Sequence, residues 1–324
     1  MIDVPLPPSP TACRPPAARG RDGIRLLFGG GHGISHHAFG DLPDLLAPGD
    51  LLVVNTSATP PAAVRLDRLW VHFSTPCEQD RGTWLVELRR RSGRATVPYR
   101  GGNAGEWIPM PGGATLTLVR RRAGRLWEAR LSADVVPYLR RYGVPIRYGY
   151  AGGHRTVIAL DPSADLPGAG RPFTPDLVTR LVARGVLMSP VSLHTGVVSL
   201  EAREPPYAER YEVPGSTADL VNHVRERGRR VVAVGATAVR ALETAATASG
   251  EVVASSGWTE HVVTPQNGVQ AVDGLLTGLH RPESPHLPML AAIAGPRLLE
   301  ETYAAALSEG YLWHEFGDVT LLMP

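Results

Sequence analysis

The second half of the chain alternates short apolar runs with segments of helical periodicity. Residues 231–234 read Val-Val-Ala-Val between Gly228 and Gly235, which is the pattern of a strand buried on both faces. Apolar runs at 51–54 and 186–193 predict two further strands of this kind. Three segments with helical periodicity are predicted helices: 176–185, 217–228 and 287–309. Strands that alternate with helices indicate an α/β architecture with largely parallel strand pairing.

The pattern changes between about Arg65 and Tyr138. Segments with β character alternate there with clusters of glycine, proline and arginine: Leu69–Phe73, Thr83–Leu88, Ala114–Val119 and Leu126–Leu131. Short strands at this spacing predict a small antiparallel β-barrel or sandwich. Upstream of them, Ile24–Phe28 and Ile34–Phe39 are predicted to form a β-hairpin closed by a glycine turn.

The segment that follows the 231–234 strand combines a turn with polar side chains. Gly235 allows the backbone to turn sharply, and Thr237 is predicted to cap the next helix by accepting from its first free amides. Arg240 and Glu243 come one turn apart on that helix and overlook the carboxyl end of the strand, where open α/β sheets bind ligands. The alternative interpretation is an ordinary strand-to-helix connection with a solvated Arg–Glu pair.

Polar residues also come at the ends of other predicted strands. These residues are Asn55, His194, Asp273, His280 and Asp318, and Thr237 of the predicted helix joins them. If these ends converge, two imidazoles and two carboxylates line one pocket, which suits a cationic or nucleoside-like ligand and proton transfer by histidine. His194 and His280 are favoured over structural histidines because each follows an apolar run next to a glycine or proline segment.

Composition narrows the chemistry. The chain has 33 basic residues, all arginine, so Schiff-base chemistry on lysine and a P-loop lysine are excluded. The net charge of +2 over 324 residues does not call for a nucleic acid partner. Arginine clusters at Arg89–Arg91 and Arg120–Arg122 are interpreted as solubilising positions that lysine cannot fill here, with nucleic acid contact as the alternative.

The remaining signals concern location. Cys13 and Cys77 are far apart and lack metal-ligand spacing, which is typical of a reduced cytosolic protein. The first residues have neither the basic start nor the apolar core of a signal peptide, and no apolar run is long enough to span a membrane. We therefore expect a soluble, cytoplasmic protein.

Motifs in a characteristic order extend along most of the chain. They include Val231–Glu243, Gly257-Trp258, Val272-Asp273, the His280-x-Pro282-x-Ser284 loop, Ala294-Gly295 and Phe316-Gly317-Asp318. In this order they resemble the S-adenosylmethionine:tRNA ribosyltransferase-isomerase family of queuosine biosynthesis. The resemblance implies a monomer with two domains. Residues 1–62 and 148–324 would form an α/β domain that binds S-adenosylmethionine, and residues 63–147 an inserted antiparallel β-barrel domain.

The resemblance also implies an unusual reaction, in which S-adenosylmethionine is consumed as a substrate and no metal is needed. The sulfonium cation acidifies the neighbouring ribose carbon, so that a base can remove a proton there. The ribosyl skeleton is then transferred to a 7-aminomethyl-7-deazaguanine base in tRNA, while adenine and methionine leave.

Candidate site residues follow from the strand ends and the motifs together. His194, Glu243 and His280 are the candidate catalytic residues. Candidate contacts to S-adenosylmethionine or to the acceptor are Asn55, Gly170, Phe173, Gly196, Gly235, Thr237, Arg240, Asp273, Ser284, Phe316 and Asp318.

Some positions depart from the family pattern. The motif that reads close to PTAGLHFT has Gly168 in place of its threonine and Pro172 in place of its histidine, and Ala58 stands where an arginine would follow Asn55. Proline can neither accept nor donate a proton, so the base is left unassigned. Three functions stay open: the tRNA reaction, action on S-adenosylmethionine with a small acceptor or as a lyase, and a non-catalytic paralogue that binds the cofactor or RNA.

Overall fold

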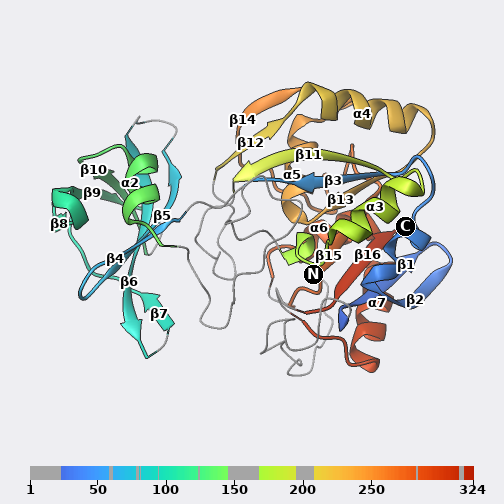
Figure 1. Cartoon of the computed structure of the whole chain (residues 1–324), viewed down its shortest axis with the longest axis horizontal. Helices are drawn as coiled ribbons and strands as arrows, with labels where there is room; N and C mark the ends of the chain where they lie inside the picture. The colour runs from blue at the N-terminus through green and yellow to red at the C-terminus, as the bar shows by residue number, and fades with distance from the viewer. Residues whose placement is uncertain are drawn as a thin grey trace. The chain divides into compact units, whose positions relative to one another are not determined.

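A computed structural model describes the chain at residues 23–57, 61–77, 80, 82–93, 95–122, 125–144, 168–194, 208–281, 284–313 and 317–324 (Figure 1). The chain divides into two compact units. The first comprises Met1–Ser57, Gly152–Leu193 and Glu201–Pro324, and the second comprises Ala58–Ala151 and His194–Leu200. Each unit has a β-sheet of its own, and the two are described in turn.

The first unit contains a nine-stranded mixed sheet in the order β14-β12-β11-β3-β13-β15-β16-β1-β2. Its strands are β1 (Arg25–Gly30), β2 (Gly33–Ala38), β3 (Leu51–Asn55), β11 (Leu187–His194), β12 (Glu209–Val213), β13 (Val231–Val234), β14 (Ser255–Thr259), β15 (Gly274–Gly278) and β16 (Val319–Met323). The four central strands β11, β3, β13 and β15 are parallel, and β16 pairs antiparallel with β15. The predicted α/β fold with parallel central strands is therefore confirmed, as is the hairpin β1–β2.

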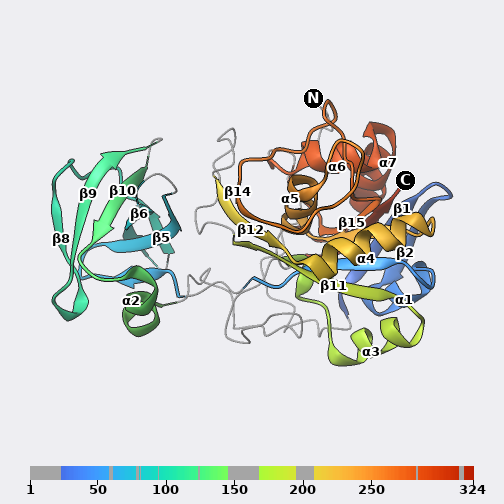
Figure 2. The ribbon, with the colours of Figure 1, turned by 90° about the horizontal axis from the view of Figure 1, so that it is seen from above.

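Helices cover both faces of this sheet (Figure 2). The helices on one face are α4 (Gly215–Glu226), α5 (Ala236–Ala245), α6 (Leu287–Ala294) and α7 (Pro296–Ser308), and those on the other are α1 (Leu42–Leu45) and α3 (Pro175–Ala183). Short 3-10 turns at Phe39–Asp41 (η3) and Gly168–Gly170 (η5) complete the unit. The result is a three-layer α/β/α arrangement.

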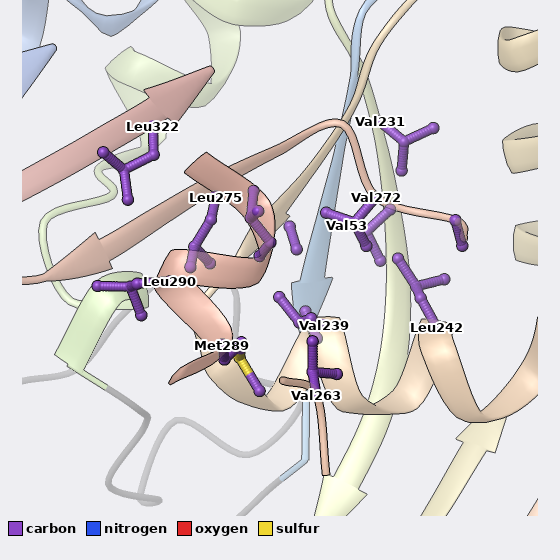
Figure 3. Close-up of a cluster of buried hydrophobic side chains, with 14 of the residues drawn as sticks. Val53, Val231, Val239, Leu242, Val263, Val272, Leu275, Met289, Leu290 and Leu322 are labelled. Atoms are coloured by element: carbon purple, nitrogen blue, oxygen red, sulfur yellow. The ribbon is translucent and has the colours of Figure 1, made fainter. Parts of the chain in front are cut away.

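Strand β13 shows why its sequence is apolar at every position. Val231 and Ala233 belong to the core shared with α4 to α7, whereas Val232 and Val234 belong to the core shared with α1 and α3. Figure 3 shows part of the first core, in which Val231 and Val53 from the sheet lie near Leu242 of α5. Because successive side chains of a strand point to opposite faces, a strand between two helical layers must be apolar throughout.

The predicted helix over 287–309 is two helices rather than one. Helix α6 ends at Ala294, and Gly295 has a φ of 75°, a conformation that a side chain disfavours. Pro296 then begins α7, since proline is tolerated in the first turn of a helix but interrupts a helix interior. The Gly-Pro pair, not the apolar periodicity, decides where the helix breaks.

The second unit is built on a seven-stranded antiparallel sheet that curls as a half-barrel. Its elements are β4 (Ala63–Arg65), β5 (Trp70–Pro76), β6 (Thr83–Ser92), β7 (Ala95–Pro98), β8 (Trp107–Pro109), η4 (Pro111–Gly113), β9 (Thr115–Arg121), β10 (Leu126–Leu131) and α2 (Val135–Tyr142). Among the described strands the order runs β4-β5-β6-β10-β9-β8, with β7 paired to β6. The antiparallel prediction is confirmed, but the pairing does not join β8 to β4, so these strands do not form a closed barrel.

Candidate active site at the amino end of helix α5

The turn from β13 to α5 is made by Gly235, which has a φ of 86° and donates its amide to the Leu276 carbonyl of β15 at 2.8 Å. Gly235 itself is the N-cap of α5, so the prediction that Thr237 caps the helix is wrong. Thr237 lies in the first turn, and its Oγ1 is buried with no hydrogen-bond partner within the part of the chain that the structure describes. A buried hydroxyl of this kind, beside the positive end of a helix, is a candidate ligand contact.

His280 follows β15 at the same edge of the sheet. Its Nε2 lies 3.0 Å from Oγ1 of Thr277, and its backbone amide donates to the hydroxyl of Tyr303 on α7 at 3.2 Å. Burial, together with the neighbouring His286, lowers the pKa of His280 to about 3. The ring is therefore neutral at physiological pH and is held in a defined orientation.

His286 is a second imidazole in this place and was not among the predicted site residues. It caps α6, and its ring centroid lies 4.9 Å from that of His280. Burial and the positive charge of Arg240 lower the pKa of His286. No hydrogen bond to its ring nitrogens is present among the residues with described positions. A neutral imidazole in this state can accept a proton from a bound molecule.

Arg240 lies on α5 and is 8% exposed. Its guanidinium pairs with Glu209 of β12 and donates to the backbone carbonyls of Thr259 at 3.3 Å and His261 at 3.1 Å. The alternative interpretation, a solvated pair with Glu243, is thus not what forms, because the two side chains have other partners. Arg240 joins α5 to the β12–β14 edge and places a positive charge close to His286.

Glu243 is 6% exposed, and its carboxylate is used by the backbone. Its two oxygens accept from the amides of Gln270 at 2.7 Å and Ala271 at 3.0 Å, which orders the segment leading into β15. Burial raises the pKa of Glu243, and these amides partly oppose the rise. The contacts favour a positioning role over the catalytic role expected from the sequence.

Asn55 and His194 end the neighbouring strands β3 and β11. Asn55 is buried, accepts from the Leu193 amide at 3.1 Å, and donates to the Leu193 carbonyl at 2.9 Å. Its side chain therefore extends the pairing of these two parallel strands beyond their regular ladder. His194 is the exposed last residue of β11.

Asp273 does not join this group, which corrects the expectation that all the polar strand ends converge. It precedes β15 at the amino edge of the parallel strands, where it accepts from the Val231 amide at 2.8 Å. Asp318 lies at the start of the antiparallel β16, and its completely buried carboxylate binds Arg25. Strand direction, which periodicity does not reveal, decides the placement of Asp273, whereas Asp318 lies at the edge where β15 ends and is occupied by Arg25.

The remaining residues predicted to contact a substrate lie in different parts of the fold. Gly170 belongs to η5, where Ala169 packs against the turn at Gly235. Phe173 is a fully buried core residue whose ring meets that of Phe39 edge-on at 5.4 Å, so it packs in the fold's interior. Ser284 accepts from the His286 amide at 3.3 Å and orders the start of α6. Gly196 and Phe316 lie outside the described residues.

The site thus gathers a buried hydroxyl without a hydrogen-bond partner among the described residues, two neutral imidazoles and a buried guanidinium at one sheet edge. The site also includes Thr277, His286 and Tyr303, which were not predicted. His286 follows the motif His280-x-Pro282-x-Ser284 by only two residues, which is the signal that could have found it. Within the described residues there is no group of three or more His, Cys, Asp or Glu side chains suited to a metal ion. None of the described helices is long and apolar enough to cross a membrane.

Comparisons with known proteins agree over nearly the whole chain. The family described as queuosine biosynthesis protein matches residues 2–322. An S-adenosylmethionine:tRNA ribosyltransferase-isomerase of Acidiphilium cryptum is 37% identical, with 99% of this chain and 98% of that protein covered. The enzyme of the same name from Moorella thermoacetica is 34% identical over the same shares.

A solved structure is also similar. The crystal structure of an S-adenosylmethionine tRNA ribosyltransferase from Thermotoga maritima is 27% identical and has a TM-score of 0.58, with 99% of both chains covered. The similarity therefore includes both units of the chain rather than a single shared module.

Proposed function

The chain belongs to the queuosine biosynthesis protein family, and on this premise we propose that it transfers the ribosyl group of S-adenosylmethionine to tRNA and isomerises it. The acceptor in this proposal is the amine of a 7-aminomethyl-7-deazaguanine base, and the product is epoxyqueuosine in tRNA. The observation that supports it most is the family match over residues 2–322, which covers almost the whole chain. S-adenosylmethionine is a consumed substrate, and no step requires a metal.

The first step needs a base close to the ribose carbon beside the sulfonium. Removal of a proton there breaks a C–H bond and leaves the electron pair on the carbon, where the adjacent positive sulfur stabilises it. His280 and His286 are the proposed acid–base pair, because the two imidazoles lie together at this edge with their ring centroids 4.9 Å apart. The proton passes to a ring nitrogen, and the same pair can return it as the later steps release adenine and methionine.

The amino end of α5 is the proposed binding point for a polar group of S-adenosylmethionine. The backbone amides of the first turn and the buried Oγ1 of Thr237 provide hydrogen-bonding groups next to the positive end of the helix dipole. The methionine carboxylate matches this chemistry. Arg240 and Glu243 act in the proposal as positioning residues, because their side chains bind neighbouring strands and loops.

The proposal extends to the domains, the oligomeric state and the location of the protein. Residues 1–62 and 148–324 form the S-adenosylmethionine-binding domain, and residues 63–147 form an inserted domain. The enzyme is a monomer that acts in the cytoplasm, where its tRNA substrate is found. Asn55, Gly170, Gly196, Gly235, Ser284 and Phe316 are retained as candidate contacts to the substrates.

The test is incubation with S-adenosylmethionine, with and without tRNA carrying the aminomethyl-deazaguanine base, followed by mass spectrometry of adenine, methionine and the digested tRNA. Release of adenine and formation of epoxyqueuosine only with this tRNA supports the proposal. Release without tRNA would instead favour a lyase or a small acceptor. Binding of S-adenosylmethionine without any release would favour the non-catalytic alternative.

Single substitutions test the assigned roles. His280→Ala and His286→Ala are each expected to lower kcat by about 10²- to 10⁴-fold while S-adenosylmethionine still binds. Added imidazole should partly rescue the variant that lacks the base. His223→Ala is the matched control, since His223 is an exposed histidine on α4. His194→Ala decides whether the exposed histidine at the end of β11 takes part as well.

A further inference from the structure

Charge is distributed very unevenly between the two units. The residues of the second unit, 58–151 and 194–200, contain sixteen arginines and seven Asp and Glu residues, a net charge of +9. The remaining residues contain seventeen arginines and 24 Asp and Glu residues, a net charge of −7. The chain total of +2 conceals this asymmetry. If arginine only replaced lysine as a solubilising residue, both units would show a similar excess of arginine over Asp and Glu.

The arginines gather at one end of the antiparallel sheet. β10 pairs with both β6 and β9: Leu126 at the start of β10 lies opposite Glu87, two residues before Arg89 of β6, and Trp127 lies opposite Arg121 at the end of β9. This arginine end comprises the described residues Arg89, Arg90, Arg91, Arg100, Arg120, Arg121, Arg122 and Arg125, with Glu87 and Glu128 as the acidic residues among them. Among these described residues, eight guanidinium groups stand with two carboxylates, a net charge of +6.

Several of these side chains are held in place yet remain open to solvent. Glu128 accepts from Arg120 at 2.9 Å and also pairs with Arg122. The side chain of Arg120 is 62% exposed and that of Arg122 is 49% exposed. Arg121 stacks over the ring of Trp127 at 4.5 Å and donates to the carbonyls of residues 100–102. Arginines that are already ordered lose less side-chain entropy when they bind a phosphate.

An exposed tryptophan lies on the sheet face that carries Arg120 and Glu128. Trp107 on β8 is 74% exposed, and it is paired in register with Thr117 of β9, which pairs in turn with Arg130 of β10. Arg120 is three residues farther along β9, about 10 Å away along the strand. Arg120 pairs with Glu128, which is two residues before Arg130 on β10, so the register shift after Glu128 leaves Arg120 on the face of Trp107. Phosphate-binding arginines next to an exposed aromatic ring are the features of a surface that binds single-stranded RNA.

We propose that this face of the second unit, from Trp107 to the arginine end, binds the phosphate backbone of the tRNA substrate and stacks one unpaired base on Trp107. The inference rests on the proposed function for the identity of the RNA. The net charge of +9 and the ordered guanidinium groups favour a polyanion over an apolar partner. An acidic protein is the competing occupant, and the experiment separates the two.

The experiment measures the Kd of the full chain for a tRNA transcript by fluorescence anisotropy at several salt concentrations. The double substitution Arg120→Gln with Arg122→Gln should raise Kd by about tenfold and reduce the slope of log K against log salt by about 1 to 2. The Trp107→Ala variant should raise Kd by a similar factor of about ten without changing the slope, because stacking is not ionic. Arg297→Gln is the matched control, at a 91% exposed arginine of the acidic first unit.

Kinetics then separate this inference from the proposed function. The double variant should raise KM for tRNA and leave both kcat and the affinity for S-adenosylmethionine unchanged, and Arg120→Lys with Arg122→Lys should restore most of the binding. If the double Gln variant bound tRNA with the same Kd as Arg297→Gln, the proposal that this face binds tRNA would be overturned. Competition by poly-glutamate as strong as that by tRNA would overturn RNA as its partner. A wild type that binds tRNA through this face but forms no epoxyqueuosine would sink the proposed function alone.

Discussion

Asp318 accepts hydrogen bonds from the backbone amide of Arg25 at 3.0 Å and from its guanidinium at 2.9 Å, although 293 positions separate the two residues. The same carboxylate accepts from the Leu312 amide at 2.9 Å. The start of β1 is thereby joined to the start of β16, its parallel neighbour in the sheet. Because Asp318 is completely buried and its oxygens serve the chain itself, the structure favours a structural role over the substrate contact expected from the motif.

Replacing Asp318 should therefore reduce stability more than catalysis. Asp318→Asn removes the charge that binds Arg25 inside the protein, and we expect a loss of about 3 kcal/mol in the free energy of unfolding. Urea denaturation followed by circular dichroism measures it, with Arg297→Gln as an exposed control. Unchanged stability together with a large rise in KM for S-adenosylmethionine would restore the substrate contact.

Thr237→Val tests whether the buried hydroxyl at the start of α5 serves a ligand. Valine keeps the shape of threonine, and within the described residues Oγ1 has no partner to lose, so stability should be unchanged or slightly higher. The Kd for S-adenosylmethionine, measured by calorimetry, should rise by about tenfold. Thr237→Ser, which keeps the hydroxyl, should bind nearly as the wild type does. Equal affinity in both variants would remove Thr237 from the site.

Glu243→Gln distinguishes a positioning residue from a base. Glutamine can accept only one of the two amide hydrogen bonds and presents an NH₂ group to the other donor, which should cost about 1–3 kcal/mol of stability. KM for S-adenosylmethionine is expected to rise, while the pH profile of turnover keeps its shape. If turnover by a fully folded variant fell by about a thousandfold or more, the catalytic role predicted from the sequence would be supported instead.

Arg240→Ala should act on both stability and pH dependence. It removes the ion pair with Glu209 and two hydrogen bonds to carbonyls, for an expected cost of about 3 kcal/mol. The positive charge of Arg240 lowers the pKa of His286, so its removal should raise that pKa. If His286 is the base, the acid limb of kcat/KM then shifts to higher pH. Arg240→Lys retains the charge and should leave that limb in place.

His72 predicts an acid sensitivity of the second unit. Burial, helped by the Arg89 charge, lowers the pKa of His72 from 6.5 to about 4. As pH falls below 6.5, only the unfolded chain gains this proton, so stability is complete above that pH and is lost progressively down to about pH 4.

His72→Gln removes the titration and should lose about 2–3 kcal/mol less than the wild type between about pH 7 and pH 4.5. Urea denaturation followed by tryptophan fluorescence reports on this unit, because four of the six tryptophans lie in it. His32→Gln, at an exposed turn, is the control. An equal loss of stability in wild type and variant would contradict the prediction.

Local patterns were sufficient for most of the secondary structure and for the family. The apolar run of β13, the hairpin β1–β2 and the short strands of the second unit all follow from side-chain period and turn residues, which act over a few neighbours. The motifs likewise led to the queuosine biosynthesis family. Such features depend on short-range preferences that each segment carries with it.

Which polar residues meet was decided by the tertiary structure. Asp273 and Asp318 each precede a strand, yet Asp273 lies at the amino edge of the parallel strands, and Asp318 closes the chain onto Arg25. Arg240 and Glu243 are one turn apart but bind different partners, whereas His280 and His286 are brought together by the turn into α6. Strand direction and long-range pairing set these contacts, and neither can be read from the spacing of residues along the chain.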